Sequence, residues 1–175
     1  TTKVLSVGGS IIAPEAPDAK FLSEFGAMAT DWLLSKKDAR LILVAGGVGP
    51  ARMYQNAYRD VAKTFTAAQK KAAGFADEAA TNNACDWLGI MATRLNAQLL
   101  KTVFGPLCEQ DVIYNPTQVG DFTGRILVAA GWKPGFSTDN DAVLLAERFN
   151  ADTVVNLSNI EKVYTDDPRK NPNAK

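Results

Sequence analysis

Histidine is absent from this chain and cysteine is scarce. None of the 175 residues is histidine, and the only cysteines are Cys85 and Cys108. A chain without histidine cannot use imidazole as a general base, and it lacks a common zinc ligand. The two cysteines do not have the spacing of a metal-ligand pair. We therefore expect two reduced thiols, no metal ligands supplied by the protein, and a cytoplasmic location.

The chain also has no excess of charge of either sign. Nineteen Lys and Arg residues balance nineteen Asp and Glu residues, so the basic footprint of a nucleic-acid-binding protein is missing at the level of the whole chain. No apolar run approaches the roughly 20 residues of a membrane-spanning helix. We expect neither a nucleic-acid partner nor a membrane partner. The content of 46% apolar and 22% charged residues is ordinary for one globular domain.

Three turns of small residues are the main positive signal, and each directly follows an apolar, β-branched run. The runs cover residues 4–7, 41–45 and 126–130, and the turns cover residues 8–10, 46–49 and 131–139. In an open α/β sheet, ligands bind beyond the carboxyl ends of the strands, where glycine lets backbone N–H groups approach a phosphate. One such turn could simply be a tight connection. Three of them favour phosphate handling.

Alternating strand and helix patterns predict an α/β fold, a three-layer αβα sandwich with a mostly parallel central sheet. We expect strands at 3–7, 40–45, 111–114, 125–130 and 153–157, and helices at 20–37, after Pro50, at 83–104 and after Thr138. Residues 63–81 are expected to form a helical or mobile excursion. Helical spacing predicts that two sets of side chains face the core: Met53, Ala57 and Val61, and then Trp87, Ile90, Met91, Leu95, Leu99 and Val103.

Polar side chains beside the turns are candidate nucleotide ligands. Arg52 can fork onto a phosphate, unless it is only a surface arginine. Asp86, Thr93 and Asn96 share a broad face of the long helix and offer groups suited to a sugar and a base edge. Asp86 could instead simply cap that helix. The Ser-Thr-Asp run at 137–139 can cap the next helix, grip a phosphoryl group, or do both.

These segments resemble the amino acid kinase superfamily, and within it the uridylate kinases of the archaeal type, over essentially the whole chain. The Gly-rich turns are shared by the wider superfamily. The run Asp86-Trp87-Leu88-Gly89-Ile90-Met91-Ala92-Thr93-Arg94-Leu95-Asn96-Ala97 is more particular to uridylate kinases, and segments 134–139, 142–147 and 163–168 continue the resemblance. It implies phosphoryl transfer from ATP to UMP, giving ADP and UDP, with Mg²⁺ accompanying ATP. It also implies a homohexamer.

The resemblance further implies a role for individual residues within a single domain at 1–175. UMP would be bound by Gly46, Gly47, Arg52, Asp86, Thr93 and Thr138. ATP would be bound by Gly8, Gly9, Ser10, Ser158, Asn159, Tyr164 and Asp167. The catalytic residues would be Asp139, Ser10 and Lys162. Acceptor binding would fall within about 1–130, and the ATP-binding part would start within 131–175. Phosphoryl transfer needs mainly alignment and charge neutralisation, so a site without histidine is adequate.

The chain departs from the family pattern in three places. Many relatives carry a lysine where Ser6 stands, so we expect Lys3, Lys133 or Lys162 to supply that charge. Glu161 and Lys162 replace the usual Asp-Gly pair. Relatives continue for several dozen residues more, so we expect a chain truncated at its C-terminal side. These departures leave two alternatives: a catalytically weakened nucleotide-binding subunit or regulator, and a family member with another acceptor.

Overall fold

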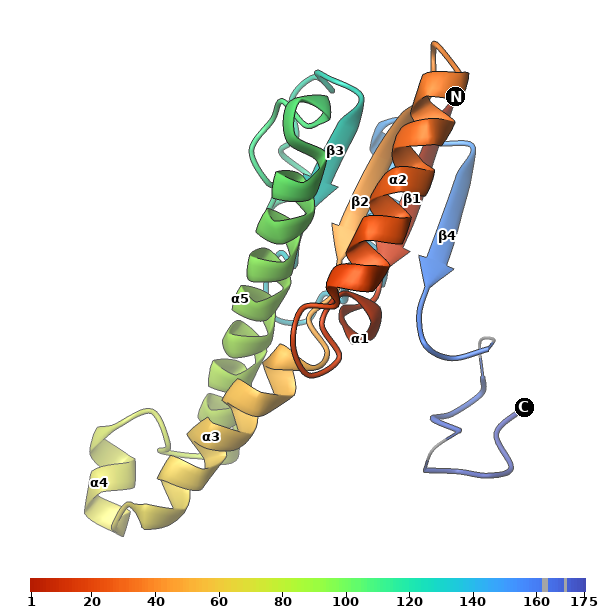
Figure 1. The fold of residues 1–175 in the computed structure, drawn as a ribbon. Coiled ribbons are helices and arrows are strands. Elements are labelled where there is room, and N and C mark those ends of the chain that lie inside the picture. Colours follow the sequence, from red (N-terminus) through yellow and green to blue (C-terminus); the bar gives the residue numbers. More distant parts are fainter. Residues whose placement is uncertain (162–163, 169) are drawn as a thin grey trace.

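A parallel four-stranded sheet forms the centre of the computed structural model, which describes residues 1–161, 164–168 and 170–175 (Figure 1). The strand order is β3-β2-β1-β4. The strands are β1 Thr2–Val7, β2 Arg40–Ala45, β3 Ile126–Ala129 and β4 Thr153–Leu157. Val4 lies opposite both Ile42 and Val154, and Leu41 lies opposite Ile126. Because all pairs are parallel, the carboxyl ends of the strands meet along one edge of the sheet.

The helices begin where the sequence supplies capping groups. The side chains of Asp18, Asp77 and Ser137 each accept a hydrogen bond from the amide three residues later, and so cap α2, α5 and α6. The helical segments are α1 Gly9–Ile12, α2 Ala19–Ser35, α3 Pro50–Thr64, α4 Ala67–Ala72, α5 Glu78–Phe104, the 3-10 turn η1 Gly105–Leu107, and α6 Thr138–Arg148.

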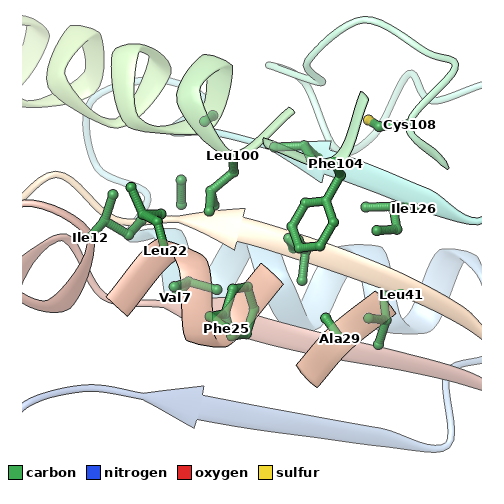
Figure 2. Close-up of a cluster of buried hydrophobic side chains, with 14 of the residues drawn as sticks. Val7, Ile12, Leu22, Phe25, Ala29, Leu41, Leu100, Phe104, Cys108 and Ile126 are labelled. Atoms are coloured by element: carbon green, nitrogen blue, oxygen red, sulfur yellow. The ribbon is translucent and has the colours of Figure 1, made fainter. Parts of the chain in front are cut away.

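Two hydrophobic clusters, one on each face of the sheet, hold the layers together. In Figure 2, Phe25 of α2 and Leu100 and Phe104 of α5 pack against Leu41 and Ile126 of the sheet. The opposite face packs against α6 through a cluster that includes Val4, Ile42, Leu127, Ala142 and Leu145. Neighbouring residues of a strand thus enter different clusters, as the pleat requires. The predicted αβα sandwich with a parallel sheet is confirmed.

Two local predictions need correction. Residues 111–114 are not a strand, because Ile113 alone bridges to Ala129. The Asn115 side chain accepts hydrogen bonds from the amide and hydroxyl of Thr117, which turns the chain away from the sheet. The excursion at 63–81, predicted to be helical or mobile, is largely helical, but it includes the start of the long helix α5 as well as the end of α3 and all of α4. The long helix therefore begins at Glu78, five residues earlier than predicted.

The predicted inward faces of α3 and α5 are largely wrong. On α3, Met53, Ala57 and Val61 are all exposed. Figure 1 shows the reason, since α3 runs beyond the end of the sheet and packs mainly along α5. On α5, Ile90 is buried and Leu99 is partly buried, but four residues of the predicted stripe are exposed: Trp87, Met91, Leu95 and Val103. The buried side chains of α5 lie at other positions, and they are Cys85, Ile90, Ala92, Thr93, Asn96, Ala97, Leu100 and Phe104.

Two of these exposed side chains, Met91 and Leu95, belong to an apolar patch between α3 and α5. We define the apolar patch as Pro50, Tyr54, Leu88, Met91 and Leu95, which line one shallow depression. Leu95 is 68% exposed and Tyr54 is 61% exposed.

Both cysteines are free and buried. Cys108 lies at the edge of the cluster drawn in Figure 2, and burial raises the pKa of its thiol. A thiol that stays protonated and covered is unreactive. Within the described part of the chain, no helix combines the length and the apolar character needed to cross a bilayer.

Candidate active site

The turns after β1 and β2 touch each other at the carboxyl edge of the sheet. The Gly46 amide donates a 2.8 Å hydrogen bond to the carbonyl of Val7. A Cβ at Gly46 would lie 2.7 Å from the amide nitrogen of Gly9, and one at Gly9 would lie 2.5 Å from that of Val48. Side chains at these glycines would collide with backbone. Glycine is therefore required here so that the two turns can pack against each other, and not only for the shape of each turn.

All three turns contribute to one cavity of about 270 Å³, which we call the Gly-turn cavity. Its lining includes ten residues predicted from the sequence as site residues: Gly8, Gly9, Ser10, Gly46, Gly47, Arg52, Thr138, Asp139, Ser158 and Asn159. The sequence interpretation required these turns to lie on the same side of the molecule, and they do. The first turns of α3 and α6 both reach this cavity, so the positive ends of two helix dipoles face it.

Arg52 is the only cation among the described residues that line the Gly-turn cavity. It lies in the first turn of α3, which starts after Gly49 at a φ of 107°. A Cβ at Gly49 would lie 2.3 Å from the carbonyl oxygen of Ala13, so glycine is required at this helix start. A guanidinium at this position can bind a phosphate with two parallel hydrogen bonds.

Ser6 takes part in the site through Asp139. Its hydroxyl donates a 2.6 Å hydrogen bond to Oδ1 of Asp139 and is itself buried. Lys3, offered as a replacement for the missing lysine, donates instead to Thr153 Oγ1 at the other end of the strands, so that expectation is wrong. Lys133 lines a neighbouring cavity. Lys162 lies outside the described residues, and its role stays a prediction.

A second cavity of about 470 Å³, which we call the α5 cavity, adjoins the first. The two share Gly47, Val48 and Thr138 in their linings. Asp86 and Thr93, both predicted to bind UMP, line the α5 cavity. The sequence reasoning missed Gln55, which also lines it. Its place three residues after Arg52 on the same helix was the available signal, because such residues share a face.

Two polar residues of α5 hold the turns in place from within the protein. Thr93 Oγ1 donates to the carbonyl of Ile90 at 2.6 Å and accepts from the amide of Gly131 at 2.7 Å. Asn96 Nδ2 donates a 2.9 Å hydrogen bond to the carbonyl of Gly46. Both side chains are buried. Since their polar groups already have protein partners, they fix the geometry of the two turns.

Asp141 is a buried acid that the sequence reasoning did not single out. It lies in the first turn of α6 and is 1% exposed, and neither carboxylate oxygen has a hydrogen-bond partner of good geometry among the described residues. Burial raises the pKa of Asp141 to about 6, and the nearby backbone of Trp132 offsets a smaller part of that rise. The sequence shows two acids in one helical turn, at Asp139 and Asp141. No sequence pattern indicates that Asp141 is buried and Asp139 exposed.

The remaining predicted ligands lie elsewhere. Tyr164 and Asp167 line neither cavity, and their assigned contacts with ATP stay predictions. Within the part of the chain that the structure describes, no three Asp, Glu, Cys or His residues gather as they would around a metal ion. Asp139 is the acidic side chain that lines the Gly-turn cavity.

The fold and the two joined cavities define an α/β protein with a candidate ligand site at the carboxyl edge of a parallel sheet. The sequence profile described as the amino acid kinase family matches residues 1–175. The chain belongs to the amino acid kinase family.

The comparisons also identify individual relatives. The uridylate kinase of Methanospirillum hungatei JF-1 is 39% identical over 176 residues, which cover 99% of this chain and 66% of the relative. That of Methanococcoides burtonii is 36% identical over 174 residues, covering 98% and 65%. The crystal structure of the uridylate kinase from Archaeoglobus fulgidus is similar with a TM-score of 0.73 and 28% identity, covering 100% of this chain and 72% of that chain. The chain thus spans about two thirds of the length of these curated relatives.

Proposed function

We propose that this protein transfers a phosphoryl group from ATP to UMP, giving ADP and UDP. The observation that carries the proposal is the junction between the two cavities at Gly47 and Thr138. A nucleotide with its nucleoside in the α5 cavity would place its phosphate in the Gly-turn cavity, where Arg52 lies. The relatives named uridylate kinase, which match nearly the whole chain, support the same reaction.

The acceptor would be held by groups from three elements. Asp86 at the α5 cavity would accept hydrogen bonds from the ribose hydroxyls, and Thr138 would lie between the nucleoside and the phosphate. Amides of Gly46 and Gly47, together with Arg52, would bind the acceptor phosphate. Thr93 contributes by positioning Gly131.

The donor would occupy the side of the Gly-turn cavity formed by β1 and β4. Its phosphates would lie on the turn at Gly8, Gly9 and Ser10 and near Ser158 and Asn159, all of which line that cavity. Tyr164 and Asp167 are proposed to contact its adenosine. An oxygen of the acceptor phosphate then attacks the γ-phosphorus, the bond to the β-phosphate oxygen breaks, and ADP leaves. The chain supplies alignment and positive charge.

Mg²⁺ is proposed to arrive with ATP and to neutralise charge on the transferring phosphates. Asp139 fits such a partner, because its carboxylate lines the Gly-turn cavity and Ser6 holds one of its oxygens. Lys162 is proposed as the cation that replaces the lysine missing at Ser6. We also propose a cytoplasmic homo-oligomer, by resemblance a homohexamer, in which the apolar patch on α3 and α5 is covered.

An acceptor panel tests this function. The protein is incubated with ATP, Mg²⁺ and one acceptor at a time, and ADP release is measured. UMP-dependent release supports the proposal. Release with another acceptor alone supports a family member of different specificity. Nucleotide binding without turnover supports a weakened subunit or regulator, which the serine at position 6 specifically favours.

A further inference from the structure

We infer that Arg94 is a positioning residue that sets the affinity for the acceptor nucleotide by fixing one wall of the α5 cavity. The inference rests on the proposed function, since it names what holds the acceptor site in shape. We call residues 131–137 the wall loop. Most of its residues line the α5 cavity, and it leads directly into Thr138 and Asp139.

Side chains of α5 hold the first two residues of the wall loop by their backbone. Thr93 Oγ1 accepts a 2.7 Å hydrogen bond from the Gly131 amide. The Arg94 guanidinium donates from Nε to the carbonyl of Gly131 at 3.4 Å and from Nη2 to the carbonyl of Trp132 at 3.1 Å. Three backbone groups of two successive residues are therefore fixed by two adjacent residues of one helix.

The guanidinium is itself held in place. Its Cζ lies 4.0 Å from the centre of the Tyr114 ring and 5.9 Å from that of Trp87. Cation–π contacts of this kind stabilise a guanidinium in one orientation. Arg94 thus joins α5, the segment around Tyr114 and the wall loop. Lysine could keep the charge, but its single ammonium group cannot reproduce the planar fork to two carbonyls.

The contacts of Arg94 lie on the acceptor side of the site only. The wall loop faces Asp86 and Gln55 across the α5 cavity, and the donor turn at Gly8–Ser10 does not line that cavity. Loosening residues 131–132 would therefore displace the acceptor wall and leave the donor turn unchanged. This asymmetry separates a positioning role from a general contribution to folding, which would affect both substrates.

The chain offers a matched control at the other end of β3. Arg125 immediately precedes β3, and its guanidinium also donates to backbone carbonyls, at 2.8 Å to Ala39, 2.7 Å to Leu33 and 2.8 Å to Lys36. Arg94 and Arg125 thus hold the two ends of one strand by the same chemistry. Only the end held by Arg94 carries the site.

The test compares Arg94→Lys with Arg125→Lys in steady-state kinetics, varying UMP at saturating ATP and then ATP at saturating UMP. For Arg94→Lys we expect the KM for UMP to rise about tenfold, the effect of losing one hydrogen bond to a charged group. The KM for ATP should stay within about twofold of the wild-type value, because a lost contact would change it by more than that. Arg125→Lys should change neither KM. An unchanged KM for UMP in Arg94→Lys, or equal increases for both substrates, would overturn the inference.

A second measurement keeps the two proposals distinguishable. If the wild-type protein does not phosphorylate UMP, the proposed function fails, and amide hydrogen exchange over residues 131–138 still tests Arg94. Faster exchange there in Arg94→Lys, but not in Arg125→Lys, supports the inference, and unchanged exchange refutes it. Tyr114→Ala removes the stacking surface without removing the arginine. It should produce a smaller change in the same direction.

Discussion

The hydroxyl of Ser6 donates a 2.6 Å hydrogen bond to the carboxylate of Asp139, joining the end of β1 to the first turn of α6. Ser6 is buried in the sheet, whereas Asp139 is exposed at the Gly-turn cavity. A residue of the central sheet therefore sets the direction of the Asp139 carboxylate, the only one among the described residues that line this cavity. The serine that replaces a lysine of the family pattern has a defined structural task here.

Ser6→Ala should lower turnover by roughly three- to tenfold, because Asp139 loses a charge-assisted hydrogen bond that fixes its orientation. The KM for UMP should change little, since the acceptor contacts remain. Steady-state kinetics measure both parameters. Ser35→Ala is the control, because Ser35 donates only to the Trp32 carbonyl near the end of α2. Full turnover in Ser6→Ala would mean that another contact orients Asp139.

Arg52→Ala should raise the UMP concentration needed for half-saturation by at least about tenfold, because a buried phosphate would lose a bidentate cationic partner. Arg59→Ala is the matched control, since Arg59 is an exposed arginine further along the same helix and lines neither cavity. Titration of each variant with UMP gives the comparison. If both variants saturate at the wild-type concentration, the acceptor phosphate lies elsewhere.

The sequence predicted the part of the site that depends on backbone geometry. Glycines at 46 and 47 after an apolar run predict a turn at a strand end, and both line the Gly-turn cavity beyond β2. Parallel strand order then brings the turns together without further information. The αβα layers were predictable for the same reason, because alternating elements and fully apolar strands leave few other arrangements.

Side-chain partners across long sequence separations could not be predicted. Arg94 meets carbonyls 37 and 38 residues away, and Ser6 meets a carboxylate 133 residues away. Helical periodicity likewise identifies an apolar face without saying what covers it. Met53 and Met91 were therefore expected in the core, whereas they lie on the surface, 55% and 56% exposed. A Cβ at Gly47 would lie 2.9 Å from the Gly89 carbonyl oxygen, so this part of α5 packs directly on the turn after β2.

Leu95→Glu should dissociate the proposed oligomer, because it places a charge in the apolar patch that a second copy would cover. The fold should be unaffected within about 0.5 kcal/mol, as expected for a surface substitution. Leu34→Glu is the control: Leu34 is 73% exposed on α2, away from the patch. Sedimentation of the three proteins gives the assembly state. A wild-type monomer, or an oligomer untouched by Leu95→Glu, would contradict this assignment of the patch.

Asp141→Asn should change how stability depends on pH. The folded protein holds the Asp141 proton with a pKa of about 6, above the ordinary value of 3.8, mainly because burial disfavours the charge. The folded chain therefore binds more protons than the unfolded chain between about pH 4 and pH 6, and the stability contribution of Asp141 falls as pH rises through that interval. At neutral pH the cost is about 3 kcal/mol, at about 1.36 kcal/mol for each unit of pKa.

Asparagine cannot ionise, so the unfolding free energy of Asp141→Asn relative to wild type should increase by about that amount from roughly pH 4 to pH 7 and then level off. Urea unfolding at a series of pH values measures the difference. Asp111→Asn should show the opposite pH trend in this difference. The hydrogen bond and charge of Lys101 lower the pKa of Asp111, so the contribution of Asp111 to stability is lost as pH falls. A difference for Asp141→Asn that stays constant across the interval would mean that this carboxylate titrates normally despite its burial.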